Sequence, residues 1–246
     1  MRKRTFLILT VLALASGVVL AQVAPAADFL QNGFQFLFYH AVRLEETLLR
    51  RDVNLLALAS DEFTKAVQDP SQRGEALLML GLIYSSLQRP GTALGYYLDF
   101  AYDQPEDPWV HALIGELYAE MGLLDQAEES FRLAIQASPE GETWARAHYG
   151  LGSVALERGE YPAAKAEFEL AVAAADSFVD ARLGLGRALY YLGEYEGAIE
   201  TLELAQLLAP RSISILEQLA LAYEAAGRAE QAAHVSSRLE ELRRGN

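Results

Sequence analysis

Apolar residues recur at helical spacing along most of the chain, and small residues recur among them at a longer, fixed interval. Apolar positions three and four residues apart form one face of an α-helix, which has about 3.6 residues per turn. Gly81 and Gly115 are 34 residues apart, and so are Gly152 and Gly186. The one irregular step, from Gly115 to Gly152, is 37 residues. The pattern predicts tandem helical units with a period of about 34 residues.

Other positions keep the same period. An aliphatic residue precedes the glycine position in five units: Leu80, Ile114, Leu151, Leu185 and Leu219. An alanine recurs in the second half of each unit: Ala93, Ala127, Ala164, Ala198 and Ala232. A large apolar residue follows four positions later in the first four units: Tyr97, Phe131, Phe168 and Leu202. Small residues let two helix axes approach closely, so the pattern predicts pairs of helices whose large residues fill the space between neighbouring pairs.

These positions, with a proline closing three of the units, resemble the tetratricopeptide repeat (TPR). The resemblance covers residues 74–244 as five repeats, and the unit 108–141 matches nearly every position. It implies an all-α fold, a right-handed α-solenoid of about five to six helix pairs.

A weaker unit precedes these five. Ala59, Phe63 and Ala66 continue the alanine and aromatic positions one period upstream. The first helix of that unit, expected over Phe29–Arg50, lacks the glycine and tyrosine positions, which leaves its register open. Residues 22–73 are therefore expected to form N-terminal helices with a degenerate first repeat.

Two departures from the period are informative. The 37-residue step inserts three residues around Glu140–Trp144, which predicts either a longer loop or a following helix longer by about one turn. The last unit has Ser236 where the other units have a large apolar residue, and its tail is rich in charge. A terminal repeat needs a polar outer face, so Ala229–Arg244 is predicted to be a capping helix.

The first 21 residues have the pattern of an export sequence. Arg2, Lys3 and Arg4 precede the apolar run Phe6–Ala21, which ends in Val19, Leu20 and the small residue Ala21. This order is typical of a secretory signal peptide, and 16 apolar residues are fewer than the roughly 20 that span a bilayer. An uncleaved membrane anchor is the alternative if Gln22–Ala27 extends the span. The protein is expected to be exported, to the periplasm, the cell envelope or the extracellular space.

Charge and composition narrow the classes of partner. The chain has 246 residues and a formal net charge of -14, from 34 Asp and Glu against 20 Lys and Arg. A chain this acidic repels phosphate backbones, which argues against nucleic acid as a partner. The absence of cysteine excludes disulfides and thiolate metal sites.

No pattern in the sequence indicates catalysis. None of the four histidines, His40, His111, His148 and His234, lies at the spacing of a metal motif. No phosphate-binding loop, nucleophile elbow or dinucleotide fingerprint occurs. We therefore expect a non-enzymatic protein without catalytic residues, metal or cofactor.

Partner binding is expected on the first helix of each pair, because the resemblance implies that these helices line a concave groove. Helical spacing assigns positions to that face. The candidates for partner binding are Leu78, Leu82, Trp109, Arg146, Tyr149, Arg187, Tyr190 and Tyr191. The other positions on the face are Glu75, Ser85, Ala112, Glu116, Ala119, Ser153, Leu156, Asp180, Leu183, Ser214, Glu217, Leu221 and Glu224. Aromatic residues mixed with arginine are typical of interface hot spots, although the tyrosines could instead be partly buried core.

The function expected from these features is an exported TPR scaffold that binds a protein or peptide in its groove. The resemblance implies a role such as an adaptor in cell-envelope assembly. A membrane-anchored scaffold and a glycan- or cell-wall-binding protein are the alternatives. Contact with a membrane is expected only if the N-terminal segment stays uncleaved.

Overall fold

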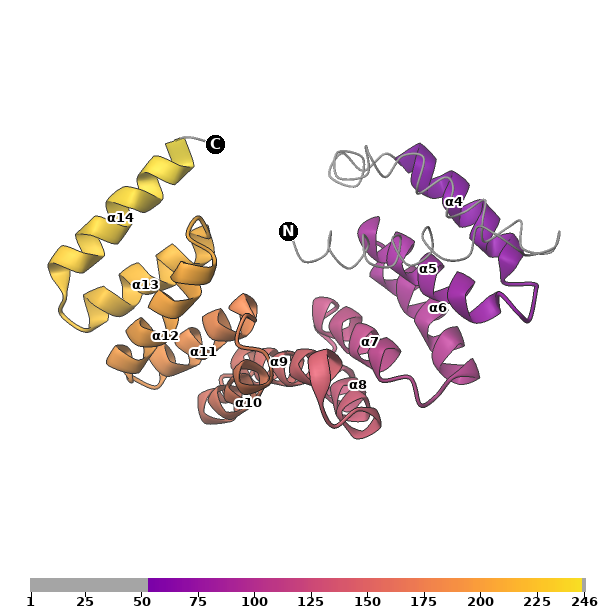
Figure 1. The fold of residues 1–246 in the computed structure, drawn as a ribbon, viewed down its shortest axis with the longest axis horizontal. Coiled ribbons are helices and arrows are strands. Elements are labelled where there is room, and N and C mark those ends of the chain that lie inside the picture. The colour runs from indigo at the N-terminus through magenta and orange to yellow at the C-terminus, as the bar shows by residue number, and fades with distance from the viewer. Residues whose placement is uncertain (1–52, 245–246) are drawn as a thin grey trace. The chain divides into compact units, whose positions relative to one another are not determined.

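The computed structural model describes residues 53–244, which form eleven helices and no strand (Figure 1). The predicted all-α repeat architecture is therefore confirmed. The helices fall into two compact units, one ending at Glu106 and the other beginning at Asp107. None of the helices in residues 53–244 has the length and apolarity to cross a bilayer. The predicted signal peptide, residues 1–21, and the predicted helix Phe29–Arg50 lie outside the described residues.

The first unit contains α4 (Val53–Ala66), α5 (Arg73–Ser86) and α6 (Pro90–Asp103). Ala59, Phe63 and Ala66 of α4 are completely buried, as the alanine and aromatic positions of a second repeat helix should be. Tyr97 of α6 is 1% exposed, and its ring lies against the backbone of Gly81 in α5. The periodic positions of the degenerate repeat thus occupy the core that their spacing predicts.

The second unit consists of four helix pairs. They are α7 (Pro108–Glu120) with α8 (Leu124–Ala137), α9 (Gly141–Glu157) with α10 (Tyr161–Ala174), α11 (Val179–Tyr191) with α12 (Tyr195–Leu208), and α13 (Ile213–Ala225) with α14 (Ala229–Arg244). The first helices of successive pairs contact one another, α7 with α9, α9 with α11 and α11 with α13. Within this unit the first helices form one layer and the second helices another (Figure 1).

Phenylalanine rings fill the space between neighbouring pairs of the second unit. The Phe131 ring lies between Gly115 of its own pair and Gly150 of the next, and the Phe168 ring lies between Gly152 and Gly184. A Cβ atom on Gly150 would come within 2.4–2.6 Å of three atoms of the Phe131 ring. The glycines are required here because the ring takes the volume that a side chain would need.

The irregular 37-residue step lengthens a helix and not a loop. Helix α9 has 17 residues, whereas α7, α11 and α13 have 13 each. The additional turn carries Trp144, whose ring meets His148 edge-on at 4.1 Å between centroids. The insertion therefore places an aromatic contact at the start of α9.

The predicted capping helix is α14, with the bounds that the sequence indicates. Its buried residues are Ala232, Val235 and Leu239, and Ser236 is half-buried where the other repeats carry a large apolar residue. The remaining surface of the helix is polar, as a terminal repeat requires.

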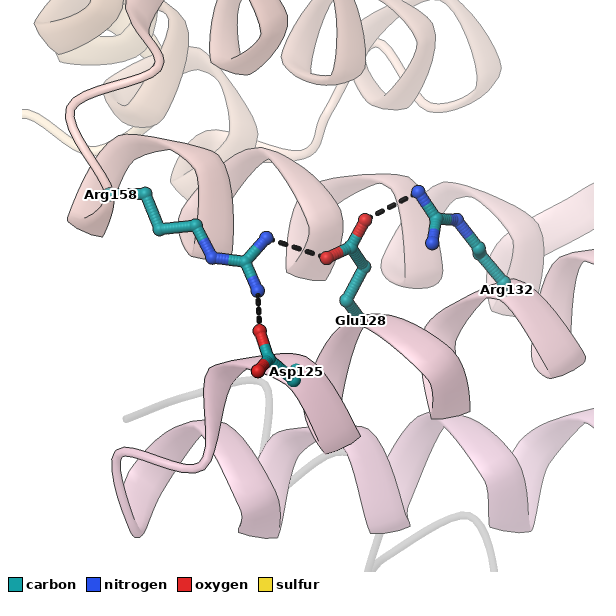
Figure 2. Close-up of polar contacts among 4 residues, drawn as sticks. All are labelled: Asp125, Glu128, Arg132 and Arg158. Atoms are coloured by element: carbon teal, nitrogen blue, oxygen red, sulfur yellow. Dashed lines mark hydrogen bonds and ion pairs between the residues drawn. The ribbon is translucent and has the colours of Figure 1, made fainter.

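Charged side chains also connect successive pairs (Figure 2). Arg158, which follows α9, reaches back to α8 and donates to Glu128 at 2.6 Å and to Asp125 at 2.5 Å. Arg132 pairs with the same Glu128. The hydrogen bond from Arg158 lowers the pKa of Glu128, with the charge of Arg132 adding to it. The cluster lies at the surface, where such pairs contribute at most about 1 kcal/mol.

Candidate functional site

A cavity of about 330 Å³ opens between α9 and α11 in the second unit. Its lining residues are Tyr149, Ser153, Leu156, Glu157, Phe168, Asp180, Leu183, Gly184 and Arg187. Six of these nine occupy positions that the repeat pattern assigns to the concave face. The ring of Phe168 is 1% exposed, so the cavity reaches down to the residue that packs between the two helix pairs.

Helical spacing explains why these side chains converge. Tyr149, Ser153 and Leu156 follow one another at four and three residues along α9 and share one face of that helix. Along α11 the shared face carries Asp180, Leu183, Gly184 and Arg187, which are three or four residues apart around the helix. Because α9 and α11 are in contact, the two faces form the opposite walls of one cavity.

Tyr149 forms the aromatic wall of the cavity. Its ring centroid lies 5.9 Å from that of Phe168 and 5.1 Å from that of Phe178. Ser153 Oγ donates a hydrogen bond of 2.9 Å to the carbonyl oxygen of Tyr149. Burial raises the pKa of the Tyr149 phenol, and the negative charge of Asp180 raises it further. The hydroxyl group therefore stays protonated at neutral pH and is able to donate a hydrogen bond.

Arg187 and Asp180 provide the free charges of the site. Arg187 is half-buried and Asp180 is exposed. Within residues 53–244, neither side chain forms an ion pair or a hydrogen bond with another residue. A half-buried guanidinium without a carboxylate partner is suited to bind a carboxylate or carbonyl oxygen of a ligand.

Arg146 lies on the same face but is already paired. Its Nε and Nη2 atoms donate to the two carboxylate oxygens of Glu116 on α7, at 2.5 and 2.7 Å. Arg146 does not line the cavity. The bidentate pair joins the first helices of two successive repeats, so the structure gives Arg146 a role in holding α7 against α9.

Tyr190 and Tyr191 belong to a separate group of tyrosines and do not line the cavity. Tyr191 is half exposed and stacks on Tyr161 of α10, with 4.7 Å between ring centroids and 13° between planes. Tyr190 meets Tyr191 at 5.6 Å and Tyr195 of α12 at 5.7 Å. These contacts join the end of α11 to the starts of α10 and α12.

The three remaining candidates are not among the residues that line the cavity. Trp109 is half-buried in the first turn of α7, where Asp107 Oδ1 caps the helix by accepting from the backbone N–H groups of Trp109 and Val110. Leu78 and Leu82 are half-buried in α5 and pack against the core of the first unit.

Sequence reasoning missed one buried polar pair. His148 is 7% exposed, and its Nδ1 atom lies 2.6 Å from Glu167 Oε2 on α10. The two residues are 19 positions apart, on different helices, so no local spacing indicated the pair. Among residues 53–244, no group of three or more His, Asp or Glu side chains is placed to hold a metal ion.

Comparison with known families identifies tetratricopeptide repeats in the chain. Family models of this repeat match residues 110–140 and residues 149–213. The second of these segments contains all the residues that line the cavity. The repeat resemblance drawn from the sequence is thereby confirmed.

Solved structures of repeat proteins share the fold. MamA from Desulfovibrio magneticus RS-1 is 24% identical, with a TM-score of 0.62, over 70% of this chain and 96% of its own. PilW, described as a widely conserved type IV pilus biogenesis factor, is 18% identical, with a TM-score of 0.71, over 88% of this chain and 92% of its own. YrrB, described as a TPR protein with an unusual peptide-binding site, is 18% identical, with a TM-score of 0.58, over 74% of this chain and 93% of its own. No protein of curated function matches the chain by sequence.

Proposed function

We propose that this protein is an exported, non-enzymatic scaffold that binds a segment of another protein in the cavity between α9 and α11. The observation that carries the proposal is the pairing of an apolar, aromatic cavity with free polar groups at its edge. Leu156, Leu183 and the Phe168 ring offer the volume for one apolar or aromatic side chain. Small-molecule and peptide sites commonly combine an apolar pocket with a few converging polar groups.

The free polar groups would orient the bound segment. The Arg187 guanidinium would bind a carboxylate or a backbone carbonyl, and Asp180 would accept from a backbone N–H or a basic side chain. The protonated hydroxyl of Tyr149 would donate to a backbone carbonyl. This arrangement favours a peptide with one large apolar residue beside polar groups of both kinds.

Export and envelope assembly are the finer part of the proposal. The basic start and apolar run of residues 1–21 favour export through a signal peptide. A scaffold of this kind outside the cytoplasm fits an adaptor in cell-envelope assembly, and PilW, which shares the fold, is described as a type IV pilus biogenesis factor. The N-terminal sequence of the protein recovered from producing cells tests this point. A chain beginning at Gln22 supports a cleaved signal peptide, whereas one beginning at Met1 or Arg2 supports the anchored alternative.

Binding in the cavity is tested with the full chain, tagged at its C-terminus and recovered from producing cells in its mature form. The double variant Tyr149→Phe, Arg187→Ala removes the phenol hydroxyl and the guanidinium but keeps the aromatic ring that packs against Phe168. Two lost hydrogen bonds, one of them to a charged group, should weaken partner capture from envelope extract at least tenfold.

The matched control is Arg211→Ala, which removes an exposed arginine outside the cavity. It should leave capture unchanged. Equal recovery of the partner by the double variant and the unmodified chain would place the interface on another surface and refute binding in the cavity.

A further inference from the structure

A row of exposed leucines follows the second helices of the second unit. Leu133 of α8, Leu170 of α10 and Leu204 of α12 occupy the same repeat position and are 41%, 41% and 49% exposed. Helix α12 extends the row with Leu207, 76% exposed, and Leu208, 48% exposed. These five residues are called the leucine row.

Packing of the repeats does not require leucine at this position. The corresponding residue is Asp99 in the first unit and Arg238 in α14, and each of these helices still packs on its partner. A single exposed leucine is ordinary on a protein surface, but here leucine recurs at one repeat position on three second helices, and α12 adds two more. Exposed apolar side chains that recur in this way are typical of an interaction site.

Exposed carboxylates border the leucine row. Glu129 lies one turn before Leu133 on α8, and Glu200 lies one turn before Leu204 on α12. Glu169 adjoins Leu170 on α10. Within residues 53–244 none of the three forms a hydrogen bond or a contact ion pair, and Glu169 interacts only through its charge, with Lys165. Glu128, by contrast, is held by Arg132 and Arg158 (Figure 2).

We propose that the leucine row is a second interaction surface, which docks an amphipathic helix with an apolar face and Lys or Arg along its edge. The apolar face would cover the leucines, and the basic edge would pair with Glu129, Glu169 and Glu200. The same carboxylates repel an anionic lipid surface, and they would oppose each other if two copies of this chain, each with a formal net charge of -14, met through the row.

The surface lies on the second helices, whereas the cavity is built mainly from the first helices α9 and α11. Binding to the leucine row is therefore separate from binding in the cavity, and either proposal can fail alone. A chain with both surfaces would bring two protein segments together.

The probe is a synthetic helix of 18 residues, about 27 Å long, with leucines at helical spacing on one face and lysines along its edges. A second peptide has glutamate in place of each lysine. Binding to the full chain is measured by fluorescence anisotropy at two salt concentrations. Vesicles of anionic lipid are tested alongside, and sedimentation measures self-association.

The triple variant Leu170→Ser, Leu204→Ser, Leu207→Ser removes the apolar surface and leaves every charge in place. It should bind the lysine peptide at least tenfold more weakly, because the peptide loses three apolar contacts. Leu221→Ser, which changes a leucine of equal exposure (41%) on α13, is the matched control and should bind normally. Circular dichroism confirms that both variants remain folded.

The charge requirement has its own variant. Glu129→Gln with Glu200→Gln should weaken binding of the lysine peptide several-fold and make that binding less dependent on salt concentration. Glu230→Gln with Glu241→Gln on α14 removes two other exposed carboxylates and should change little.

Three results would overturn the proposal. The first is equal binding of the lysine peptide by the leucine triple variant and the unmodified chain. The second is binding of the glutamate peptide to the unmodified chain as tightly as the lysine peptide. The third is vesicle binding or self-association that the triple variant abolishes, since the occupant would then be a membrane or a second copy.

Discussion

The middle and the end of the second unit close the space between helix pairs in different ways. In the middle, Phe131 and Phe168 each lie between two glycines from successive first helices. At the end, Leu202 of α12 lies against one glycine, Gly186, and the position of the second glycine is taken by Gln218. There, Tyr223 of α13 donates a hydrogen bond of 2.5 Å to Glu203 of α12.

The difference separates two kinds of interface. A ring held between two backbones has no polar group to satisfy, but it tolerates no additional atom on either side. An aliphatic side chain supported by a hydrogen bond depends less on exact fit and more on the protonation of its polar groups. The stability of the middle interfaces should therefore depend on side-chain volume, and the stability of the end interface should depend on pH.

Removal of the large side chain should have the greatest effect, and the effect should be larger in the middle. Phe168→Ala leaves a cavity in contact with both glycines and should lower the free energy of unfolding by about 3–5 kcal/mol. Leu202→Ala removes a smaller side chain and should cost about 2–3 kcal/mol. Urea denaturation followed by circular dichroism measures both, with Leu170→Ala at the surface as the control. Equal losses for Phe168→Ala and Leu202→Ala would remove the distinction between the two interfaces.

Addition of one methyl group should have an intermediate effect, with opposite signs at two glycines. Gly150→Ala places a Cβ atom 2.4–2.6 Å from the Phe131 ring and should cost about 1–3 kcal/mol. Gly197→Ala lies within α12, where the nearest atoms, on Leu189, are 3.7–3.8 Å away, and it should stabilise the helix by up to about 1 kcal/mol. Thermal unfolding measures the shifts. A higher melting temperature for Gly150→Ala would show that the ring does not need the glycine.

Loss of the hydrogen bond at the end of the unit should have the smallest effect, about 1 kcal/mol for Tyr223→Phe at neutral pH. Burial, aided by the hydrogen bond to Glu203, raises the pKa of Tyr223 from 10.0 to about 12. A raised pKa of a phenol means that the folded state keeps the proton longer. The stabilisation is therefore fully present below pH 10 and is lost as the pH rises towards 12.

Alkaline unfolding tests this difference. Between pH 10 and 12 the unmodified chain should lose more stability than Tyr223→Phe, and absorbance at 295 nm should show one late-ionising tyrosine fewer in the variant. Tyr102→Phe changes a tyrosine that is 88% exposed and should behave as the unmodified chain does. The same loss in the chain and in Tyr223→Phe would mean that the hydrogen bond does not stabilise the interface.

Most of the fold could be predicted from the sequence because every unit buries small and large residues at the same repeat positions. The bounds of α14 and the buried positions of α4 follow from one period. The 37-residue step predicted an insertion but left open whether a loop or a helix would be longer, and the structure shows that it is helix α9. The candidate site was predicted in part. Tyr149 and Arg187 lie at the cavity, because helical spacing alone places them on the faces of α9 and α11 that meet.

The other candidates show the limit of that reasoning. Arg146 pairs with Glu116, 30 residues away, and Tyr191 stacks on Tyr161, 30 residues away. A period assigns a residue to a face of its helix, but it does not say which side chain of the neighbouring helix will reach it. Residue spacing therefore does not predict which candidate binding residues form contacts within the fold.

The repeat period predicts the number of described helix pairs, their order and the positions that meet between them, because small and large residues alternate at a period that only stacked pairs can bury. The period does not predict which charged side chains on the groove face lack a partner; packing between neighbouring repeats sets that. Arg187 and Arg146 are both assigned to the groove face, yet Arg187 lines an open cavity and Arg146 pairs with a carboxylate. That outcome depends on the distance and direction between side chains of neighbouring repeats, which packing sets.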